Sequence, residues 1–370
     1  MKSLRILIVT HSPLLAEFGA SQVAINFGEA LKELGHDVTV WSPQPLPPQM
    51  KWWQTLRHMR IRVDAFINSQ EAFDLIDSPS SFITSRMRKS AIVISRSTQP
   101  AILYLKSDFA IPSRWSLSQL IRLPFHYLYT LFHVYLVLQG WQKANYILCL
   151  GSLELHWMKK WFPFWRNKVF MYLNALSTSD QAALAKVRDQ RQQQSTDKLR
   201  FLWIGRWTAH KGIHALLNFI HDWSTERPHD TFTIAGCGYD AEKDCPQFLM
   251  QRGTLKILPS FKREELFSLL AAHNVGLFTS KVEGWGLSLN EMLESGMPVF
   301  ATSAGAVADL QSFFSTLQPF PPPLHFHLTL QQMKVFDEYY KTFSWQQIAQ
   351  HYLQSVIPQF VGEGAKGYYQ

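Results

Sequence analysis

Cysteine is scarce in this sequence, with three residues among 370, and their spacing fits neither a disulfide framework nor a metal site. Cys149, Cys237 and Cys245 are therefore expected to be reduced thiols. An apolar run long enough for a transmembrane helix is also missing, since residues 123–138 are too few and include a proline and two histidines. A buried helix is expected there. The first residues, MKSLRILIVTHSP, predict a strand and not a signal peptide, so a cytoplasmic protein is expected.

Two site signatures are absent as well. The chain has no G-x-G-x-x-G loop, and no acidic residue ends the second predicted strand, which disfavours a dinucleotide-dependent oxidoreductase. It also has no D-x-D motif and no His/Cys cluster, so no metal site is predicted. Nothing in the sequence indicates a nucleic-acid partner. Negative charge that develops in a reaction must then be stabilised by cations and helix dipoles.

What the sequence has is length, apolar content and a regular alternation of elements. At 370 residues, with 46% hydrophobic and 17% charged residues, the chain fits two domains with real cores. Short apolar runs alternate with helical patterns in both halves, which predicts two Rossmann-like parallel sheets. The predicted strands are 5–10, 37–41, 73–76, 91–95, 146–150, 201–205, 231–235, 255–258, 275–278 and 299–301.

The predicted domains are 1–176 and 200–342. The segment between them, 177–199, is polar and poor in aromatic residues, which is typical of a linker. Residues 44–70, rich in proline, tryptophan and basic residues, are interpreted as an irregular insertion.

The most informative stretch is 280–302, SKVEGWGLSLNEMLESGMPVFAT. Glu283 and Glu291 lie eight positions apart and bracket a glycine-rich turn, between an apolar strand and a helical pattern. Such a turn lies at the carboxyl edge of a parallel sheet, where a helix amino terminus attracts anions. A plainer alternative is that Ser288 and Glu291 form a capping box and Glu283 is a solvated loop acid.

The string EGWGLSLNEMLESGMPV resembles the E-x7-E signature of glycosyltransferase family 4, a retaining family with the GT-B fold. A second match comes directly after the predicted strand 201–205. Arg206, Lys211 and Gly212 there resemble the family's G-R-x(4)-K-G. The resemblance implies an α/β fold of two Rossmann-like domains that face each other across a cleft. Because F-S-W precedes the last helical pattern, it also implies that a helix within 343–362 packs back on the first domain.

The resemblance also implies roles for single residues. Arg206 and Lys211 would clamp the diphosphate of a nucleotide sugar, Glu283 would bind the donor sugar, and Glu291 would bind the ribose. Three amides would cap the phosphates, and two small residues of the first loop would face them. The amides are those of Gly286, Leu287 and Ser288, and the small residues are Gly19 and Ala20.

The implied enzyme is a retaining, metal-independent hexosyltransferase of polysaccharide biosynthesis. Its co-substrate would be a nucleotide diphosphate sugar, with no separate cofactor, and its acceptor a glycan or a lipid-linked glycan. The family often carries an acceptor-side histidine after its fourth strand, whereas this chain has Arg96-Ser97-Thr98. A protein that binds nucleotide sugars without catalysis therefore remains an alternative.

Basic residues are concentrated in the first half of the chain. Residues 1–175 hold 19 Lys and Arg against 10 Asp and Glu, and the segment 156–168 mixes cations with large aromatics. That composition is typical of an interfacial segment, so we expect peripheral contact with an anionic membrane on its inner face. The predicted lipid contacts are Lys159, Lys160, Arg166 and Lys168. The alternative is a core helix with an exposed basic edge.

Overall fold

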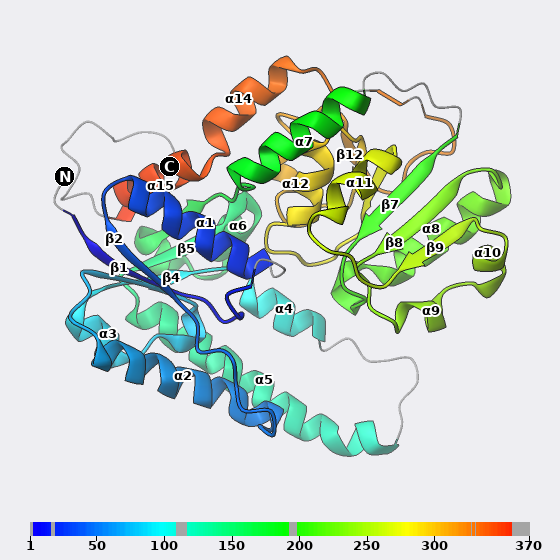
Figure 1. The fold of residues 1–370 in the computed structure, drawn as a ribbon. Helices are drawn as coiled ribbons and strands as arrows, with labels where there is room; N and C mark the ends of the chain where they lie inside the picture. The colour runs from blue at the N-terminus through cyan, green and yellow to red at the C-terminus, as the bar shows by residue number, and fades with distance from the viewer. Residues whose placement is uncertain are drawn as a thin grey trace. The chain divides into compact units, whose positions relative to one another are not determined.

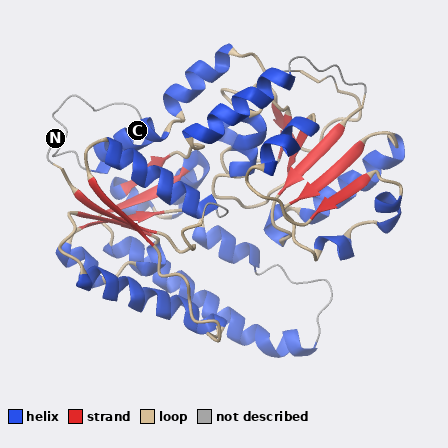
Figure 2. Ribbon diagram, viewed as in Figure 1, coloured by secondary structure: helices blue, strands red, loops and turns tan. Residues whose placement is uncertain are grey.

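The computed structural model describes residues 3–15, 19–108, 117–191, 198–326, 328–329 and 331–356. The chain forms two compact units, one of residues 1–174 with 343–370 and one of residues 175–342. Each unit contains a six-stranded parallel sheet with flanking helices (Figure 2). The α/β class and the two Rossmann-like sheets are therefore confirmed.

The sheet of the first unit has the strand order β2-β1-β3-β4-β5-β6. In register, Ile6 of β1 lies opposite both Val38 of β2 and Leu75 of β3. The sixth strand was not predicted from the sequence. The strands are β1 (Arg5–Val9), β2 (Asp37–Trp41), β3 (Leu75–Ser78), β4 (Ile92–Arg96), β5 (Tyr146–Leu150) and β6 (Val169–Tyr172).

Helices cover both faces of this sheet, with α1 and α15 on one side and α2 and α5 on the other (Figure 1). The helices are α1 (Gly19–Glu33), α2 (Trp52–Ser69), η1 (Ser80–Phe82), α3 (Ser85–Ser90), α4 (Ala101–Asp108), α5 (Leu117–Lys143), α6 (Gly151–Trp161), η2 (Pro163–Lys168) and α15 (Trp345–Val356). The last helix packs on α1, where the rings of Phe27 and Tyr352 meet edge to face at 4.8 Å. Residues 357–362 of the predicted helix lie outside the described residues.

The interpretation of 44–70 as irregular was wrong, because residues 52–69 form α2. Leu56, Met59 and Val63 recur at helical spacing and are buried in the core beneath the sheet. The prolines that suggested a loop lie before the helix; of the basic residues, Arg57 is exposed and Arg60 donates to the backbone oxygen of Ser81 at 2.7 Å. Composition therefore hid a helix whose apolar positions were correctly spaced.

The expectation of a buried helix at 123–138 was half right. Helix α5 buries Leu136, Val137 and Trp141, but its opposite face leaves large apolar side chains exposed. The exposed set is Phe125, Leu128, Leu131, Phe132 and Tyr135. A helix with apolar side chains on every face was interpreted as buried on every face. Among the described residues, only one of its faces is covered. Among the described helices, none is both long and apolar enough to cross a membrane.

The sheet of the second unit has the order β12-β11-β10-β7-β8-β9. The strands are β7 (Arg200–Ile204), β8 (Thr231–Ala235), β9 (Leu255–Leu258), β10 (Val275–Phe278), β11 (Val299–Ala301) and β12 (Leu317–Pro319). The last strand was not predicted; it carries Pro319 and lies at the sheet edge, the position where a strand tolerates proline. The helices are α7 (Thr178–Arg191), η3 (Ala209–Lys211), α8 (Ile213–Glu226), α9 (Ala241–Asp244), α10 (Gln247–Gln251), α11 (Glu265–Ala272), α12 (Leu287–Glu294), α13 (Val307–Leu310) and α14 (Lys334–Thr342).

The linker predicted at 177–199 is largely a helix of the second unit, α7. Arg188 donates to the backbone oxygen of Glu294 at 2.8 Å, and Arg191 donates to those of Ser295 at 3.1 Å and Leu270 at 2.7 Å. These arginines thus satisfy carbonyls at the ends of α12 and α11. The buried side of α7 combines Leu184 and Val187 with these two arginines, so the segment has little apolar content and was wrongly predicted as a linker.

Candidate functional site

The first part of the site is the turn that follows β7. Gly212, at the start of α8, has a φ of 71°, and a Cβ there would lie 1.9 Å from the backbone oxygen of Thr279. Only glycine fits this position. The hydroxyl of Thr279 donates to the backbone oxygen of Lys211 at 2.8 Å. The loops after the neighbouring strands β7 and β10 are thereby held together.

This close approach brings Lys211 to Glu283. The Lys211 ammonium forms an ion pair with Glu283 Oε2, and both side chains are only 12–13% exposed. The hydroxyl of Ser280 donates to the same carboxylate oxygen at 3.2 Å. Arg206 lies in the same turn as Lys211 and is exposed. Three residues predicted to act on the donor, one carboxylate and two cations, therefore belong to adjacent loops at one edge of the sheet.

The second part is the amino terminus of α12. Gly286 is its N-cap with a φ of 91°, and a Cβ there would lie 2.8 Å from the ring of Phe278. The capping-box interpretation of Ser288 and Glu291 is wrong, because Ser288 lies inside the helix. The amides of Gly286, Leu287 and Ser288 begin this helix, where N–H groups lack an acceptor four residues back and the helix dipole is positive.

Glu291 lies one turn further into α12 and is buried. Its carboxylate forms an ion pair with Arg263, which also contacts Asp180 Oδ2 at 2.9 Å. Burial raises the pKa of Glu291, and the charge of Arg263 opposes that rise. Sequence reasoning missed both partners, since Asp180 falls in the segment interpreted as a linker and Arg263 carries no motif. The ribose contact of Glu291 stays a prediction.

A buried hydrogen-bond chain supports the turn from below. Trp285 Nε1 donates to Asn290 at 2.9 Å, Asn290 donates to the hydroxyl of Tyr339 at 2.8 Å, and that hydroxyl donates to Glu294 at 2.8 Å. Tyr340 donates to the second oxygen of Glu294 at 3.0 Å. Burial raises the pKa of Glu294 to about 7. These hydrogen bonds link the turn before α12 to α14. None of the residues that form them is predicted to contact substrate.

We expect the Glu294→Gln variant to gain stability relative to the wild type as pH rises from about 5 to 8. The raised pKa means that the folded state holds the proton more tightly than the unfolded state, so the free energy of unfolding falls through this window. Because Gln does not titrate, the gain in free energy of unfolding of the variant over wild type approaches the order of 3 kcal/mol at pH 8. Urea unfolding at several pH values measures it. Glu338→Gln, on an exposed glutamate, should show no such trend, and parallel curves for Glu294→Gln and wild type would refute the assignment.

Two further predicted features concern metals and the first loop. Over the part of the chain that the structure describes, no group of three or more His, Cys, Asp or Glu side chains could hold a metal ion. Gly19 and Ala20 begin α1 in the first unit. Their contact with donor phosphates stays a prediction.

Comparison with known proteins agrees with this geometry. Residues 186–312 match the family model of glycosyl transferases group 1, and the match includes Arg206, Lys211, Glu283 and Glu291. No curated protein sequence matches the chain. The family resemblance is confirmed at the level of group 1 over residues 186–312, which match as a glycosyltransferase domain of that group.

Solved structures show the same fold over nearly the whole chain. Sucrose-phosphate synthase from Thermosynechococcus elongatus is 15% identical with a TM-score of 0.62, covering 96% of this chain and 94% of that one. The catalytic domain of starch synthase IV from Arabidopsis thaliana, bound to ADP and acarbose, is 12% identical with a TM-score of 0.62, covering 96% and 99%. The trehalose-6-phosphate protein of E. coli, bound with UDP-2-fluoro glucose, is 12% identical with a TM-score of 0.63, covering 95% and 98%. The expected GT-B architecture is confirmed.

Proposed function

We propose that this glycosyltransferase moves a hexose from a nucleotide diphosphate sugar to a glycan or lipid-linked acceptor, with retention of configuration and without a metal ion. The observation that carries the proposal is the Lys211–Glu283 pair beside the amino terminus of α12. Arg206, Lys211 and the first amides of α12 would stabilise the departing diphosphate, as cations and oriented N–H groups do for developing anions. Glu283 would bind the hydroxyls of the sugar next to that diphosphate.

The bound ligands of two structural relatives support a nucleotide-linked donor. The starch synthase holds ADP with acarbose, and the E. coli protein holds a fluorinated UDP-glucose. The resemblance to the family-4 signature supports retention of configuration, because family 4 is a retaining family. A protein that binds nucleotide sugars without turnover is the second candidate, favoured by the arginine, Arg96, where the family often has an acceptor histidine.

The test is a product screen with the full chain in excess chelator. UDP-, GDP- and ADP-hexoses are offered with soluble oligosaccharides and with lipid-linked acceptors, and products are identified by mass spectrometry and their anomeric configuration by NMR. We expect a glycosylated product with retained configuration. Activity that disappears with chelator and returns with metal contradicts the metal-independent mechanism, and donor binding without any product or released sugar favours the second candidate.

The predicted membrane segment lies in α6 and η2. Trp161 and Phe164 are exposed, at 61% and 71%, beside the exposed cations Lys160 and Arg166. Lys168 does not join them, because its ammonium donates to the backbone oxygens of Trp141 and Ala144 at the end of α5. Other aromatics of the segment pack in the core, namely Trp157, Phe162 and Trp165. The core interpretation therefore holds for part of the segment, and lipid contact by its exposed part stays a prediction.

We expect salt-sensitive binding to vesicles of phosphatidylserine and phosphatidylcholine. Neutralising Lys159, Lys160 and Arg166 together to Gln should weaken binding about tenfold or more at low salt, since each cation near an anionic surface contributes up to about 1 kcal/mol. Vesicle cosedimentation measures it. The same charge change at three exposed cations of the second unit, Arg252, Lys256 and Lys262, is the matched control. Equal binding of the two triple variants would refute the membrane contact.

A further inference from the structure

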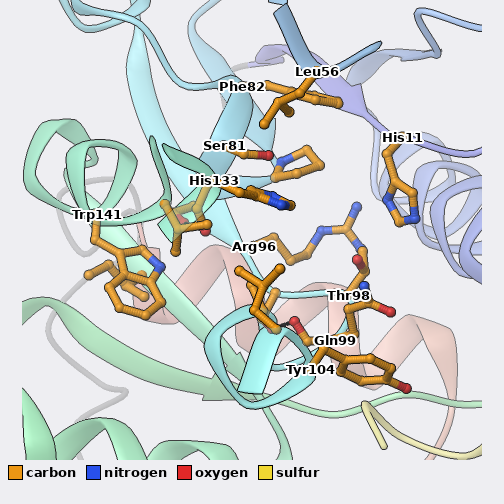
Figure 3. Close-up of a pocket in the computed structure, with 18 of the residues that line it drawn as sticks. His11, Leu56, Ser81, Phe82, Arg96, Thr98, Gln99, Tyr104, His133 and Trp141 are labelled. Carbon is orange, nitrogen blue, oxygen red and sulfur yellow. Dashed lines mark hydrogen bonds between the residues drawn. The ribbon is translucent and has the colours of Figure 1, made fainter. Parts of the chain in front are cut away.

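A cavity of about 410 Å³ lies within the first unit, between the carboxyl ends of its strands and the inner face of α5 (Figure 3). We call it the α5 cavity. Its lining includes His11 after β1, residues 79–82 after β3 and residues 96–99 at the end of β4. The strand order turns at β1, where the chain goes to β2 on one side and then to β3 on the other. Ligands of open α/β sheets bind at this kind of switch point.

The polar end of the α5 cavity is centred on Arg96, which is 3% exposed. Its Nε donates to Asp77 at 2.7 Å, and the other oxygen of Asp77 accepts a hydrogen bond from Tyr352 at 3.0 Å. Arg96 Nη1 is buried and has no hydrogen-bond partner among the described residues. A buried N–H without an acceptor costs about 1–3 kcal/mol, and more on a charged group. The arginine is therefore held in place by Asp77, with its guanidinium 5.2 Å from the ring centre of Phe27 and 5.8 Å from that of Tyr172, while its Nη1 has no hydrogen-bond acceptor among the described residues.

Histidines lie around the same space. In Figure 3 the imidazole of His133 and the guanidinium of Arg96 point toward one region, and His11 faces that region from the other side. Burial lowers the pKa of His133, and a bound anion would reverse that effect. Glu154 also lines the cavity, but both of its oxygens are engaged, by Ser97 at 2.7 Å and by the amide of Leu150 at 2.7 Å.

The rest of the α5 cavity is apolar. Its wall is formed by side chains of α2, η1, α5 and α6, which are Leu56, Met59, Phe82, Val137, Trp141 and Met158. A nucleotide or a bare oligosaccharide would leave its hydroxyls without partners along this wall. A hydrocarbon chain would lose nothing there, and the volume falls in the range of small-ligand pockets.

We propose that the α5 cavity binds an anionic amphiphile, with its phosphate or carboxylate on Arg96 and His133 and its hydrocarbon chain along the apolar wall. As the site of a lipid-linked acceptor the inference rests on the proposed function; as a binding site it stands on Arg96 and the cavity alone. Binding gives Arg96 Nη1 a hydrogen-bond acceptor and buries the hydrocarbon chain of the ligand.

The test uses the full chain and three probes with the same twelve-carbon chain: dodecyl phosphate, dodecanoate and neutral dodecanol, each below its critical micelle concentration. Isothermal titration calorimetry should show one site, with dodecyl phosphate or dodecanoate bound at least tenfold more tightly than dodecanol. The order of the two anions distinguishes a phosphate from a carboxylate ligand. Equal affinity for all three probes, or no binding of any, overturns the proposal.

Variants separate the two ends of the site. Removing Arg96 alone would leave the buried Asp77 carboxylate without a cation, so the double variant Asp77→Asn with Arg96→Gln removes both charges and keeps a hydrogen-bonded pair. It should lose the preference for anions and keep dodecanol binding. Val137→Phe, which fills the apolar part, should weaken all three probes, and unchanged binding in this variant places the amphiphile elsewhere and overturns the proposal. Transfer activity is assayed in parallel: probe binding without transfer counts against the proposed function alone.

Discussion

Arg206→Ala should lower kcat/KM for sugar transfer by about 10²–10³-fold, while the fold is unchanged. Arg206 is exposed in the turn between β7 and α8, next to the Lys211–Glu283 pair. It supports no core packing, so its loss removes only a charge that would act on the departing diphosphate. Removal of one group that stabilises developing charge typically costs this much. Steady-state kinetics with the donor found in the product screen measures the effect.

The control for this variant is Arg252→Ala. It removes an exposed arginine of the same unit, which lies between α10 and β9. Its guanidinium lies over the ring of Phe248, so the substitution also loses one surface contact. Circular dichroism should show that both variants are folded. Near-normal turnover in Arg206→Ala contradicts its assignment to the diphosphate, whatever the control does.

Sequence periodicity predicted the sheets well wherever a strand is buried on both faces. The runs at 146–150, 231–235 and 275–278 coincide with the inner strands β5, β8 and β10. A strand between two helical layers needs apolar side chains on both sides, so it stands out as a short continuous run. Edge strands have no such requirement. Edge position alone does not decide the outcome, because the edge strands β2 and β9 were predicted at 37–41 and 255–258, whereas the edge strands β6 and β12 were missed.

The site shows the same division between local and distant signals. Arg206, Lys211, Glu283 and Gly286 could be found because each lies in a loop whose conformation requires specific residue types at fixed spacing. Glycine at 286, for example, is required by its φ of 91° and by the ring of Phe278. Arg263, in contrast, reaches Glu291 from 28 positions earlier in the chain. No spacing rule connects a loop arginine to a carboxylate across a tertiary contact.

Polar helices were the main source of error. Helix α7 buries Arg188 and Arg191, and the pKa of Arg191 is lowered to about 10, mainly because it is buried. Its guanidinium donates to carbonyls at helix ends, so a segment with low apolar content is still part of the core. Hydrophobic periodicity is weak in such a helix, because two of its four buried residues, Arg188 and Arg191, are charged and only Leu184 and Val187 are apolar.

Glu283→Gln should lower kcat by about 10²–10³-fold and leave the affinity for free nucleoside diphosphate equal or higher. The carboxylate of Glu283 is held by Lys211 and Ser280. Its proposed partner is the sugar rather than the nucleotide. In the absence of donor this carboxylate also neutralises Lys211. Gln keeps the shape but not the charge, so Lys211 becomes a stronger partner for the diphosphate while the sugar loses a charged acceptor.

Calorimetry with free UDP, GDP and ADP measures the affinity for the nucleoside diphosphate, and steady-state kinetics measures kcat. Glu242→Gln, which neutralises an exposed glutamate of α9, is the matched control and should change neither quantity. A dissociation constant for the nucleoside diphosphate that rises more than about tenfold would mean that Glu283 holds the nucleotide, since tenfold corresponds to about 1.4 kcal/mol of lost binding. Unchanged turnover would mean that the Lys211–Glu283 pair only braces the two loops, and the reacting sugar would then have to be bound by other groups of the turn.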